Sequence, residues 1–313
     1  MVIIFGSELR GDDVAALVRF GAAQQARLIC LGDYANSRGA ADMGLYPDLL
    51  PGYAPLASSS FDREWGGRIP VQPGLSLAQM LDAARDHKLH ALYVVGSNPV
   101  ARYTVDPFVL QAPFLVVQDM FMTETAMLAD VILPAANAYE KAGTFTNTCG
   151  DLQLLKKAGD VASVKSDFEI IVRIAEKMNF DIRNLVPFGG GMRADFGQTR
   201  GAQSGEADRH AVWLHAHGLE PKVSPFDPIA VLDEIQRLVP GYDVSRLGLL
   251  AGNDQQTRLV NIQPAEIQSH PEGIVPSQDA LFTSGTLSRY SNTLNSVMEN
   301  KSKSRTDREV VAD

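Results

Sequence analysis

Residues 91–134 read ALYVVGSNPVARYTVDPFVLQAPFLVVQDMFMTETAMLADVILP and contain three short apolar runs, at 91–95, 114–117 and 131–133. Such nearly continuous apolar runs are typical of strands that are buried on both faces of a parallel sheet. Two segments separate the runs: a partly helical one at 100–111, which Pro107 interrupts, and a short helix at 123–129. This order of strand, helix and strand predicts an α/β fold with a mainly parallel sheet.

The same alternation extends toward both ends of the chain. Before residue 91, we expect strands at 2–5 and 27–31 and helices at 12–25 and 75–87, the last with Ser76 as its N-cap. After residue 134, we expect a β-prone segment at 144–155, which Gly150 punctuates, and helices at 168–178 and 228–238. Either Ser166 or Asp167 can cap the helix at 168–178, and its spacing places four residues inward: Ile170, Ile171, Ile174 and Ala175.

The composition changes after residue 183. Glycines recur between residues 189 and 205 with little apolar periodicity, which indicates a loop. The sequence therefore predicts two parts, an α/β domain at 1–182 and a C-terminal region at 183–313. The second part contains the glycine-rich loop and a helix, and it ends in a polar tail.

Charge and cysteine content exclude several classes of protein. The formal net charge is −9, whereas binding to a nucleic-acid backbone needs clustered Lys and Arg, so we expect no nucleic-acid partner. No segment approaches the roughly 20 apolar residues of a membrane span, so we expect no direct span. Two cysteines, Cys30 and Cys149, are too few for a four-thiolate iron–sulfur cluster.

Four motifs follow one another between residues 91 and 155. They are LYVVGSNP at 92–99, VVQD at 116–119, TETA at 123–126 with ADVILPA at 129–135, and EKAGTFTN at 140–147. In this order and spacing they resemble the molybdopterin oxidoreductase superfamily, which includes formate dehydrogenases, nitrate reductases and dimethyl sulfoxide reductases. The resemblance implies a Rossmann-like, mainly parallel sheet of the formate dehydrogenase and dimethyl sulfoxide reductase type, with a looser C-terminal region.

A second set of motifs narrows the resemblance. ANSRGAADMG at 35–44, PDLLPGY at 47–53 and SGTLS at 284–288 look like the C-terminal part of the large iron–sulfur subunit of NADH-quinone oxidoreductase (respiratory complex I). The cysteine and histidine cluster ligands of that subunit have no counterpart here. The resemblance implies a non-catalytic structural part of the peripheral arm, which supports electron transfer from NADH to quinone through clusters on other segments.

This resemblance also implies the partners and the place of the chain. We expect the other peripheral-arm subunits as partners, among them a chain that carries the missing N-terminal iron–sulfur half. We expect no cofactor in this chain, with iron–sulfur clusters and FMN elsewhere in the complex. The complex would place the chain on the cytoplasmic side of the inner membrane, as a peripheral component.

Two other interpretations stay open. The first is half of a molybdopterin-dependent oxidoreductase, similar to formate dehydrogenase, which a separate N-terminal chain completes and which holds molybdopterin guanine dinucleotide. The second is a free-standing nucleotide-binding module. Both depend on a pocket at the carboxyl ends of the predicted strands.

The resemblance assigns six residues to a relic of the pterin-dinucleotide pocket: Gly96, Ser97, Asn98, Asp119, Thr144 and Asn147. A glycine at the end of a parallel strand lets backbone N–H groups approach a phosphate. The Asp119 carboxylate can accept hydrogen bonds from a guanine edge. Alternatively, residues 96–99 form a simple strand-ending turn, and Asp119 caps the next turn by bonding the backbone two residues on.

The sequence departs from the pterin enzymes after Asn147. Those enzymes usually continue with Glu and Arg, whereas residues 148–151 here are Thr, Cys, Gly and Asp. The missing Arg is a natural partner for phosphate, and its loss argues against a bound molybdenum cofactor. Cys149 is not expected to be a metal ligand, since that ligand normally lies earlier in such enzymes.

We expect structural and not catalytic roles for the remaining polar residues. We expect Thr123 to be the N-cap of a helix start, and Asp130 to make a buried or capping hydrogen bond. Nothing in the sequence places Glu124 and Glu140 within reach of one substrate for general acid–base catalysis, so no catalytic residue is assigned. The pair His215 and His217 is expected at the surface, and the glycine-rich loop lacks the Lys-Ser pair that a phosphate-binding loop needs.

Overall fold

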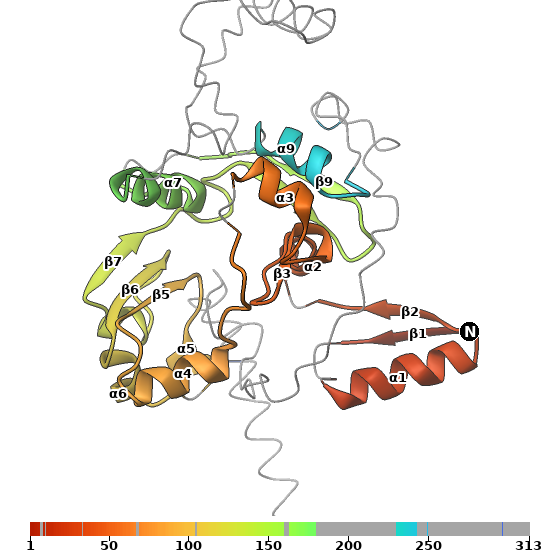
Figure 1. Cartoon of the computed structure of the whole chain (residues 1–313), viewed down its shortest axis with the longest axis horizontal. Helices are drawn as coiled ribbons and strands as arrows, with labels where there is room; N and C mark the ends of the chain where they lie inside the picture. Colours follow the sequence, from red (N-terminus) through yellow and green to blue (C-terminus); the bar gives the residue numbers. More distant parts are fainter. Residues whose placement is uncertain are drawn as a thin grey trace, which may run out of the picture.

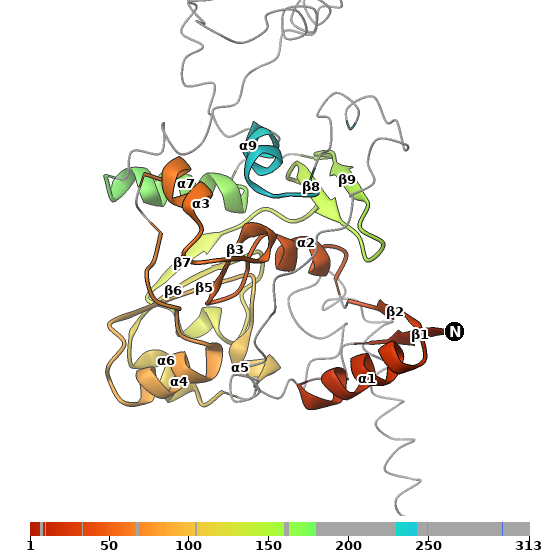
Figure 2. The same ribbon diagram turned by 45° about the vertical axis from the view of Figure 1, so that its right-hand side comes forward.

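A computed structural model describes residues 1–6, 9, 11–32, 34–66, 69–103, 105–159, 163–179, 230–242, 249 and 296. Figure 1 shows the arrangement of the elements, and Figure 2 shows it after a 45° turn. Four predictions lie outside the described residues: the glycine-rich loop, the histidine pair, the SGTLS motif and the polar tail. The division into 1–182 and 183–313 stays a prediction.

The main sheet is parallel, as predicted. Its strands lie in the order β5 (Ala91–Val95), β6 (Phe114–Asp119) and β7 (Val131–Pro134). Each strand pairs in parallel register with its neighbour, so the carboxyl ends of all three strands meet at one edge. The α/β class with a mainly parallel sheet is therefore confirmed.

Helices cover one face of this sheet. They are α4 (Leu77–Arg85) and α6 (Pro107–Gln111), while α5 (Pro99–Arg102) follows β5 directly. The core between these helices and the sheet includes Leu81, Ala84, Val94, Val109, Leu110, Leu115 and Val117. Leu110, Leu115 and Val117 are completely buried, so this layer excludes water and holds the strands in place.

Helix boundaries follow local capping. Ser76 caps α4 in a reciprocal box with Gln79, which confirms the predicted N-cap. The predicted helix at 100–111 is two short helices, because Pro107 begins α6 at its first turn and Asp106 caps it. The predicted helix at 123–129 is a single 3-10 turn, η2 (Ala126–Leu128).

A second parallel sheet lies at the N-terminal end. It pairs β1 (Val2–Phe5) with β2 (Arg27–Cys30), and α1 (Asp12–Ala23) connects them. Figures 1 and 2 show α1 on one side of this pair. The helix approaches closely because Gly21 lies against Leu28, where an added Cβ would come within 3.1 Å of a Leu28 methyl carbon.

The third group of elements surrounds a separate core. It contains α2 (Ser37–Asp42), β3 (Leu49–Leu50), η1 (Pro51–Tyr53), β4 (Ala54–Pro55), α3 (Ser59–Glu64), the antiparallel hairpin β8 (Gly143–Thr146) and β9 (Leu152–Leu155), and α9 (Ala230–Leu238). Leu50, Phe61, Leu152, Leu232, Val239, Tyr242 and Leu249 form its buried centre. Described residues after 183 thus share a core with Leu50, Phe61 and Leu152 of the 1–182 region.

Helix α7 (Asp167–Lys177) begins at Ser166, whose side chain accepts a hydrogen bond from the Glu169 N–H. The predicted inward face is wrong at one position, because Ile171 is exposed and Val172 is buried. Ile170 and Val172 project about 200° apart on a helix with 3.6 residues per turn. Helix α7 therefore contacts neighbours on two sides, and Ile171 between them faces solvent.

None of the described helices is both long enough and apolar enough to cross a membrane.

The completely buried side chain of Leu115 gives the first testable prediction. Leu115→Ala should lower the free energy of unfolding by about 2–5 kcal/mol, because it removes apolar contacts and leaves a cavity. Leu45→Ala is the matched control, since Leu45 is 80% exposed and its truncation should cost within about 0.5 kcal/mol. Urea denaturation measures both values, and equal losses would contradict this account of the core.

Candidate functional site

The carboxyl edge of the β5–β6–β7 sheet carries four of the six predicted pocket residues. Gly96 follows β5, and its N–H donates to the Gln118 carbonyl oxygen at 2.8 Å. Gly96 has φ of +57°, and a Cβ there would meet no atom within 4 Å. The glycine therefore serves a left-handed backbone at an open position, which fits the strand-ending turn. Ser97 beside it is half-buried.

Asn98 is turned inward from this edge. It is 1% exposed, and its Nδ2 donates to a Glu124 carboxylate oxygen at 2.6 Å. Its Oδ1 accepts from the Thr125 hydroxyl at 2.8 Å and from the Thr125 N–H at 3.3 Å. Both ends of the amide are thus occupied by protein groups. These bonds join the loop after β5 to the loop after β6.

Asp119 makes the turn contact that the sequence allowed as the alternative. Its Oδ1 accepts from the Phe121 N–H at 3.0 Å, two residues on, and the side chain is 5% exposed. The structure therefore confirms the capping contact of Asp119. Its predicted role toward a guanine edge stays a prediction.

Neighbouring polar residues also make local structural bonds. The Thr123 hydroxyl oxygen accepts from the Ala126 N–H at 3.1 Å, but the N-cap of η2 is Thr125, so the predicted N-cap lies two residues too early. An Asp130 oxygen accepts from the Leu115 N–H at 2.7 Å, which confirms the hydrogen bond expected of that residue. Glu140 accepts from the Asn137 N–H at 2.9 Å, while Glu124 holds Asn98. The two glutamates thus bond different partners.

Thr144 and Asn147 lie on the β8–β9 hairpin and not on the sheet edge. Thr144 pairs with Leu154 in the hairpin. The Asn147 Oδ1 accepts from the Asp151 N–H at 2.9 Å, and the Asn147 N–H donates to the Asp151 carbonyl oxygen at 3.0 Å. Asn147 therefore closes the hairpin turn. This turn includes Gly150, whose φ of +90° suits glycine.

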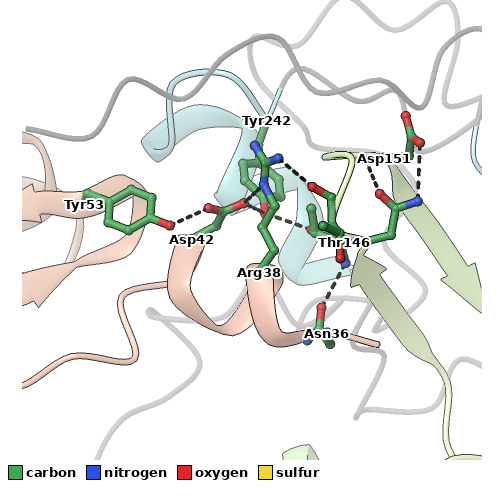
Figure 3. Close-up of polar contacts among 9 residues, drawn as sticks. Asn36, Arg38, Asp42, Tyr53, Thr146, Asp151 and Tyr242 are labelled. Carbon is green, nitrogen blue, oxygen red and sulfur yellow. Dashed lines mark hydrogen bonds and ion pairs between the residues drawn. The ribbon is translucent and has the colours of Figure 1, made fainter. Parts of the chain in front are cut away.

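A buried polar cluster, which the sequence did not reveal, surrounds Asp42. We call it the Asp42 cluster, and it consists of Asn36, Arg38, Asp42, Tyr53, Thr146 and Tyr242 (Figure 3). Asp42 is 2% exposed and accepts from the Tyr53 hydroxyl at 2.8 Å and the Tyr242 hydroxyl at 2.9 Å. Arg38 Nε lies 3.5 Å from the same Asp42 oxygen that Tyr242 contacts. The cluster joins α2, η1 and the residues after α9.

The hairpin is bonded to this cluster as well. The Thr146 hydroxyl lies 2.8 Å from the Tyr242 hydroxyl, and the Thr146 N–H donates to the Asn36 side-chain oxygen at 2.9 Å. Gly39 allows this approach, since a Cβ there would lie 2.1 Å from Asn36 Oδ1 and 3.2 Å from the Thr146 nitrogen. The spacing of Asn36, just before α2, and of Gly39 and Asp42 within it was the signal that could have predicted the contact.

Burial and the Asp42 charge shift the tyrosines of the cluster. Burial, followed by the hydrogen bond to Asp42 and the Asp42 charge, raises the pKa of Tyr53 well above its usual range. Burial is also the main cause that raises the pKa of Tyr242, and the Asp42 charge adds to it while the Thr146 hydroxyl opposes it. Both phenols therefore stay protonated as hydrogen-bond donors to the buried carboxylate.

A second polar network ties α7 to the sheet. The Gln118 side chain is completely buried, and its Nε2 donates to an Asp167 oxygen at 2.7 Å. The Tyr93 hydroxyl donates to the Gln118 side-chain oxygen, and Lys141 forms an ion pair with Asp167. This network fixes the start of α7 at the carboxyl end of β6.

The described pocket residues fit a pterin dinucleotide poorly. The Asn98 amide bonds Glu124 and Thr125, and Asn147 bonds its own hairpin, so neither amide is offered to a ligand. Glu124 adds a carboxylate at the same edge, which disfavours an anionic pyrophosphate. Within the described ranges, no group of three His, Cys, Asp or Glu side chains is arranged to hold a metal ion.

The Asp42 cluster predicts a loss of stability at alkaline pH. Tyr53 and Tyr242 have raised pKa values in the folded state, so the free energy of unfolding should be maintained below pH of about 10 and should fall above it. The double variant Tyr53→Phe/Tyr242→Phe should show a shallower fall, and Tyr139→Phe, at an exposed residue, should behave as wild type. Urea denaturation at about pH 8, 9, 10 and 11 measures how the free energy of unfolding changes with pH. Equal changes for wild type and all variants would contradict the prediction.

Asn98 gives a second prediction at this site. Asn98→Asp replaces a buried amide donor with a carboxylate that faces Glu124, so the free energy of unfolding should fall by about 2–3 kcal/mol or more. The control is Asn137→Asp, because the Asn137 side chain acts as an acceptor from the Tyr139 N–H, which a carboxylate can replace. Thermal unfolding compares the two, and an equal effect would show that the Asn98 donor bond is unimportant.

Comparison with known proteins gives the family. The model of the family described as molybdopterin oxidoreductase matches residues 7–177. An NADH-quinone oxidoreductase subunit of Rhizobium meliloti, named G 2, is 43% identical over 159 residues, which are 47% of this chain and 19% of that protein. NADPH-Fe(3+) oxidoreductase subunit alpha of Geobacter sulfurreducens is 30% identical over 264 residues, which are 79% of this chain and 26% of that protein.

Formate dehydrogenases are similar at comparable identity. F420-dependent formate dehydrogenase subunit alpha of Methanocaldococcus jannaschii is 39% identical over 152 residues, which are 46% of this chain and 22% of that protein.

Among solved structures, acetylene hydratase from Pelobacter acetylenicus aligns with a TM-score of 0.33 and 20% identity, over 41% of this chain and 19% of that one. The chain spans about a fifth to a quarter of the length of these curated relatives. Since the family model covers more than half of the 313 residues, the chain belongs to the molybdopterin oxidoreductase family.

Proposed function

We propose that this chain is a non-catalytic structural part of the peripheral arm of an NADH-quinone oxidoreductase. The observation that carries the proposal is the inward orientation of Asn98. Its amide, which a pterin-binding role would require to face the sheet edge, instead bonds Glu124 and Thr125 at 1% exposure. The residue at this edge thus holds two loops together, as a scaffold requires.

The similarity to relatives supports the same proposal. The Rhizobium meliloti NADH-quinone oxidoreductase subunit is the relative with 43% identity, compared with 39% for the Methanocaldococcus jannaschii formate dehydrogenase. The motif ANSRGAADMG supplies Asn36, Gly39 and Asp42, and these residues position α2 against β8 and the residues after α9. The motif thus has a structural use in this chain.

In this proposal the chain contributes packing and orientation. Iron–sulfur clusters and FMN belong to other segments of the complex, where electrons pass from NADH to quinone. The chain is peripheral on the cytoplasmic side of the inner membrane, and its partners are the other peripheral-arm subunits. Within the chain, residues 1–182 form the family-type α/β domain, and residues 183–313 form a C-terminal region that contributes α9 to the second core.

The alternative is half of a molybdopterin-dependent oxidoreductase that a separate N-terminal chain completes. Two observations favour it. Several relatives at comparable identity are named formate dehydrogenases, such as the Methanocaldococcus jannaschii protein. Gly96 also presents an exposed, positive-φ backbone at the carboxyl edge of a parallel sheet, which is where such folds place their ligands.

The proposal predicts the metal content of the native assembly. The full chain, tagged at one end and purified with its partners from the native source, should bring down FMN, iron and NADH-oxidising subunits. Molybdenum and tungsten should be substoichiometric, because the Asn98 and Asn147 amides are committed to internal hydrogen bonds. Elemental mass spectrometry measures the metals, and flavin fluorescence after acid release measures FMN.

The opposite result identifies the alternative. Stoichiometric molybdenum or tungsten with an extractable pterin, together with formate-dependent dye reduction, would overturn the scaffold proposal. A parallel purification of an unrelated tagged protein from the same cells controls for metals that bind the resin or the tag.

A further inference from the structure

A helix from beyond the predicted boundary at residue 182 lies on the elements that surround Asp42. This helix is α9, which begins at Ala230, whereas the part of the chain described before it ends at Asn179. Figures 1 and 2 both show α9 beside α3 and the β8–β9 hairpin. We call residues 230–242, which are α9 and the turn after it, the strap.

Apolar side chains of the strap belong to the second core. Leu232, Val239 and Tyr242 are each 2% exposed. They are three of the seven buried residues described in this core, which also contains Phe61 of α3 and Leu152 of β9. Removing the strap would therefore open the core and expose apolar surface of α3 and β9 to water, which is unfavourable.

Polar contacts hold α9 to the end of α3. The Trp65 Nε1 donates to a Glu234 carboxylate oxygen at 2.9 Å, and Glu234 is 9% exposed. Arg237 forms an ion pair with Glu64 at 2.6 Å, where both side chains are largely exposed. The bond to Glu234 is mostly buried, so we expect it to stabilise the contact more than the ion pair at the surface does.

The turn after α9 directs Tyr242 back toward α2. Gly241 has φ of +90°, a left-handed backbone that suits glycine, and the Tyr242 N–H donates to the Val239 carbonyl oxygen at 3.2 Å. The turn brings the Tyr242 hydroxyl between the Asp42 carboxylate and the Thr146 hydroxyl. The strap thus contacts α2 and the hairpin with a single side chain.

The order of donors in this contact follows from the number of protons. The Tyr242 hydroxyl has one proton, which it donates to Asp42 at 2.9 Å. The Thr146 hydroxyl, 2.8 Å away, is therefore the donor to Tyr242. Asp42 and Thr146 are each 2% exposed, so the loss of the Tyr242 hydroxyl would leave two buried polar groups short of a partner.

We propose that the strap is a conformational device that controls how firmly the β8–β9 hairpin is held. Thr146 is the last residue of β8, and the same hairpin carries the predicted pocket residues Thr144 and Asn147. Residues 1–182 are then incomplete as a folding unit, and the strap stays bound when the chain between Asn179 and Ala230 is cut. The proposal goes beyond the proposed function, because these contacts are the same in a scaffold and in an enzyme.

Hydrogen exchange on the full chain tests the hold on the hairpin. Tyr242→Phe keeps the ring in the core and removes the hydroxyl, so the amides at 143–146 and 152–155 should exchange at least about tenfold faster. The amides at 91–95 and 114–119 should stay within about twofold of wild type. The matched control is Tyr53→Phe, since Tyr53 also donates to Asp42 but comes from η1. It should change hairpin exchange by less than about threefold.

A cut in the full chain tests the strap as a docked element. A recognition site for a sequence-specific protease is inserted between Gly201 and Ala202, where the sequence predicts a loop. After cleavage, size-exclusion chromatography at about 1 μM shows whether the two pieces elute together. Leu232→Asp places a charge in the core, whereas Arg237→Ala removes only the exposed ion pair.

We expect the cut wild type and the cut Arg237→Ala chain to elute as single complexes. The cut Leu232→Asp chain should retain at least about tenfold less of the C-terminal piece, because a buried charge without a partner opposes docking. Circular dichroism of the uncut Leu232→Asp chain shows whether it folds. If it does not, the comparison of Tyr242→Phe with Tyr53→Phe decides the proposal.

Four results would overturn the strap. They are separation of the wild-type pieces, equal retention by Leu232→Asp, equal hairpin exchange in the Tyr242→Phe and Tyr53→Phe chains, or a uniform acceleration of exchange along the whole Tyr242→Phe chain. None of these measurements depends on molybdenum, iron or FMN. The strap and the proposed function can therefore fail separately.

Discussion

A buried carboxylate must be compensated by hydrogen-bond donors, and the Asp42 carboxylate imposes this constraint on the chain. Its oxygens accept from Tyr53 and Tyr242, and Arg38 lies beside it. These donors come from α2, η1 and the segment after α9, so the carboxylate is satisfied only when all three are assembled. The hairpin joins through Thr146, which contacts both Tyr242 and Asn36. The second hydrophobic core forms around this arrangement.

The carboxyl edge of the main sheet follows the same principle. Polar residues at this edge can face a ligand or one another, and in this chain Asn98 faces Glu124 and Thr125. Asp119 bonds the backbone of its own turn. At this edge Gly96 forms an open turn, while the buried Asn98 amide joins the loop after β5 to the loop after β6. This combination fits the structural role that we propose for the chain.

Apolar packing of the two parallel sheets is one-sided among the described residues. Each parallel sheet packs against helices on one side, where Leu115 and Val117 of the main sheet are fully buried, and is apolar on the other. Among the described residues, the buried polar groups of the Asp42 cluster and of Asn98 have hydrogen-bond partners, whereas each parallel sheet buries its apolar side chains mainly on one face.

The sequence by itself determined the parallel α/β class, the strand at 91–95 and the cap Ser76, because apolar alternation and capping depend on neighbouring residues. It left Ser166 and Asp167 as alternatives for the cap of α7, and the structure selects Ser166. It also indicated the turn bond of Asp119, which spans two residues. Only the tertiary structure decided the contacts between residues that lie far apart in the sequence. The contact of Asp42 with Tyr242 joins residues 200 apart, and the exposure of Ile171 depends on which neighbours surround α7. The direction of the Asn98 amide likewise depends on Glu124, a partner from another loop. Such non-local partners exist only once the chain has folded.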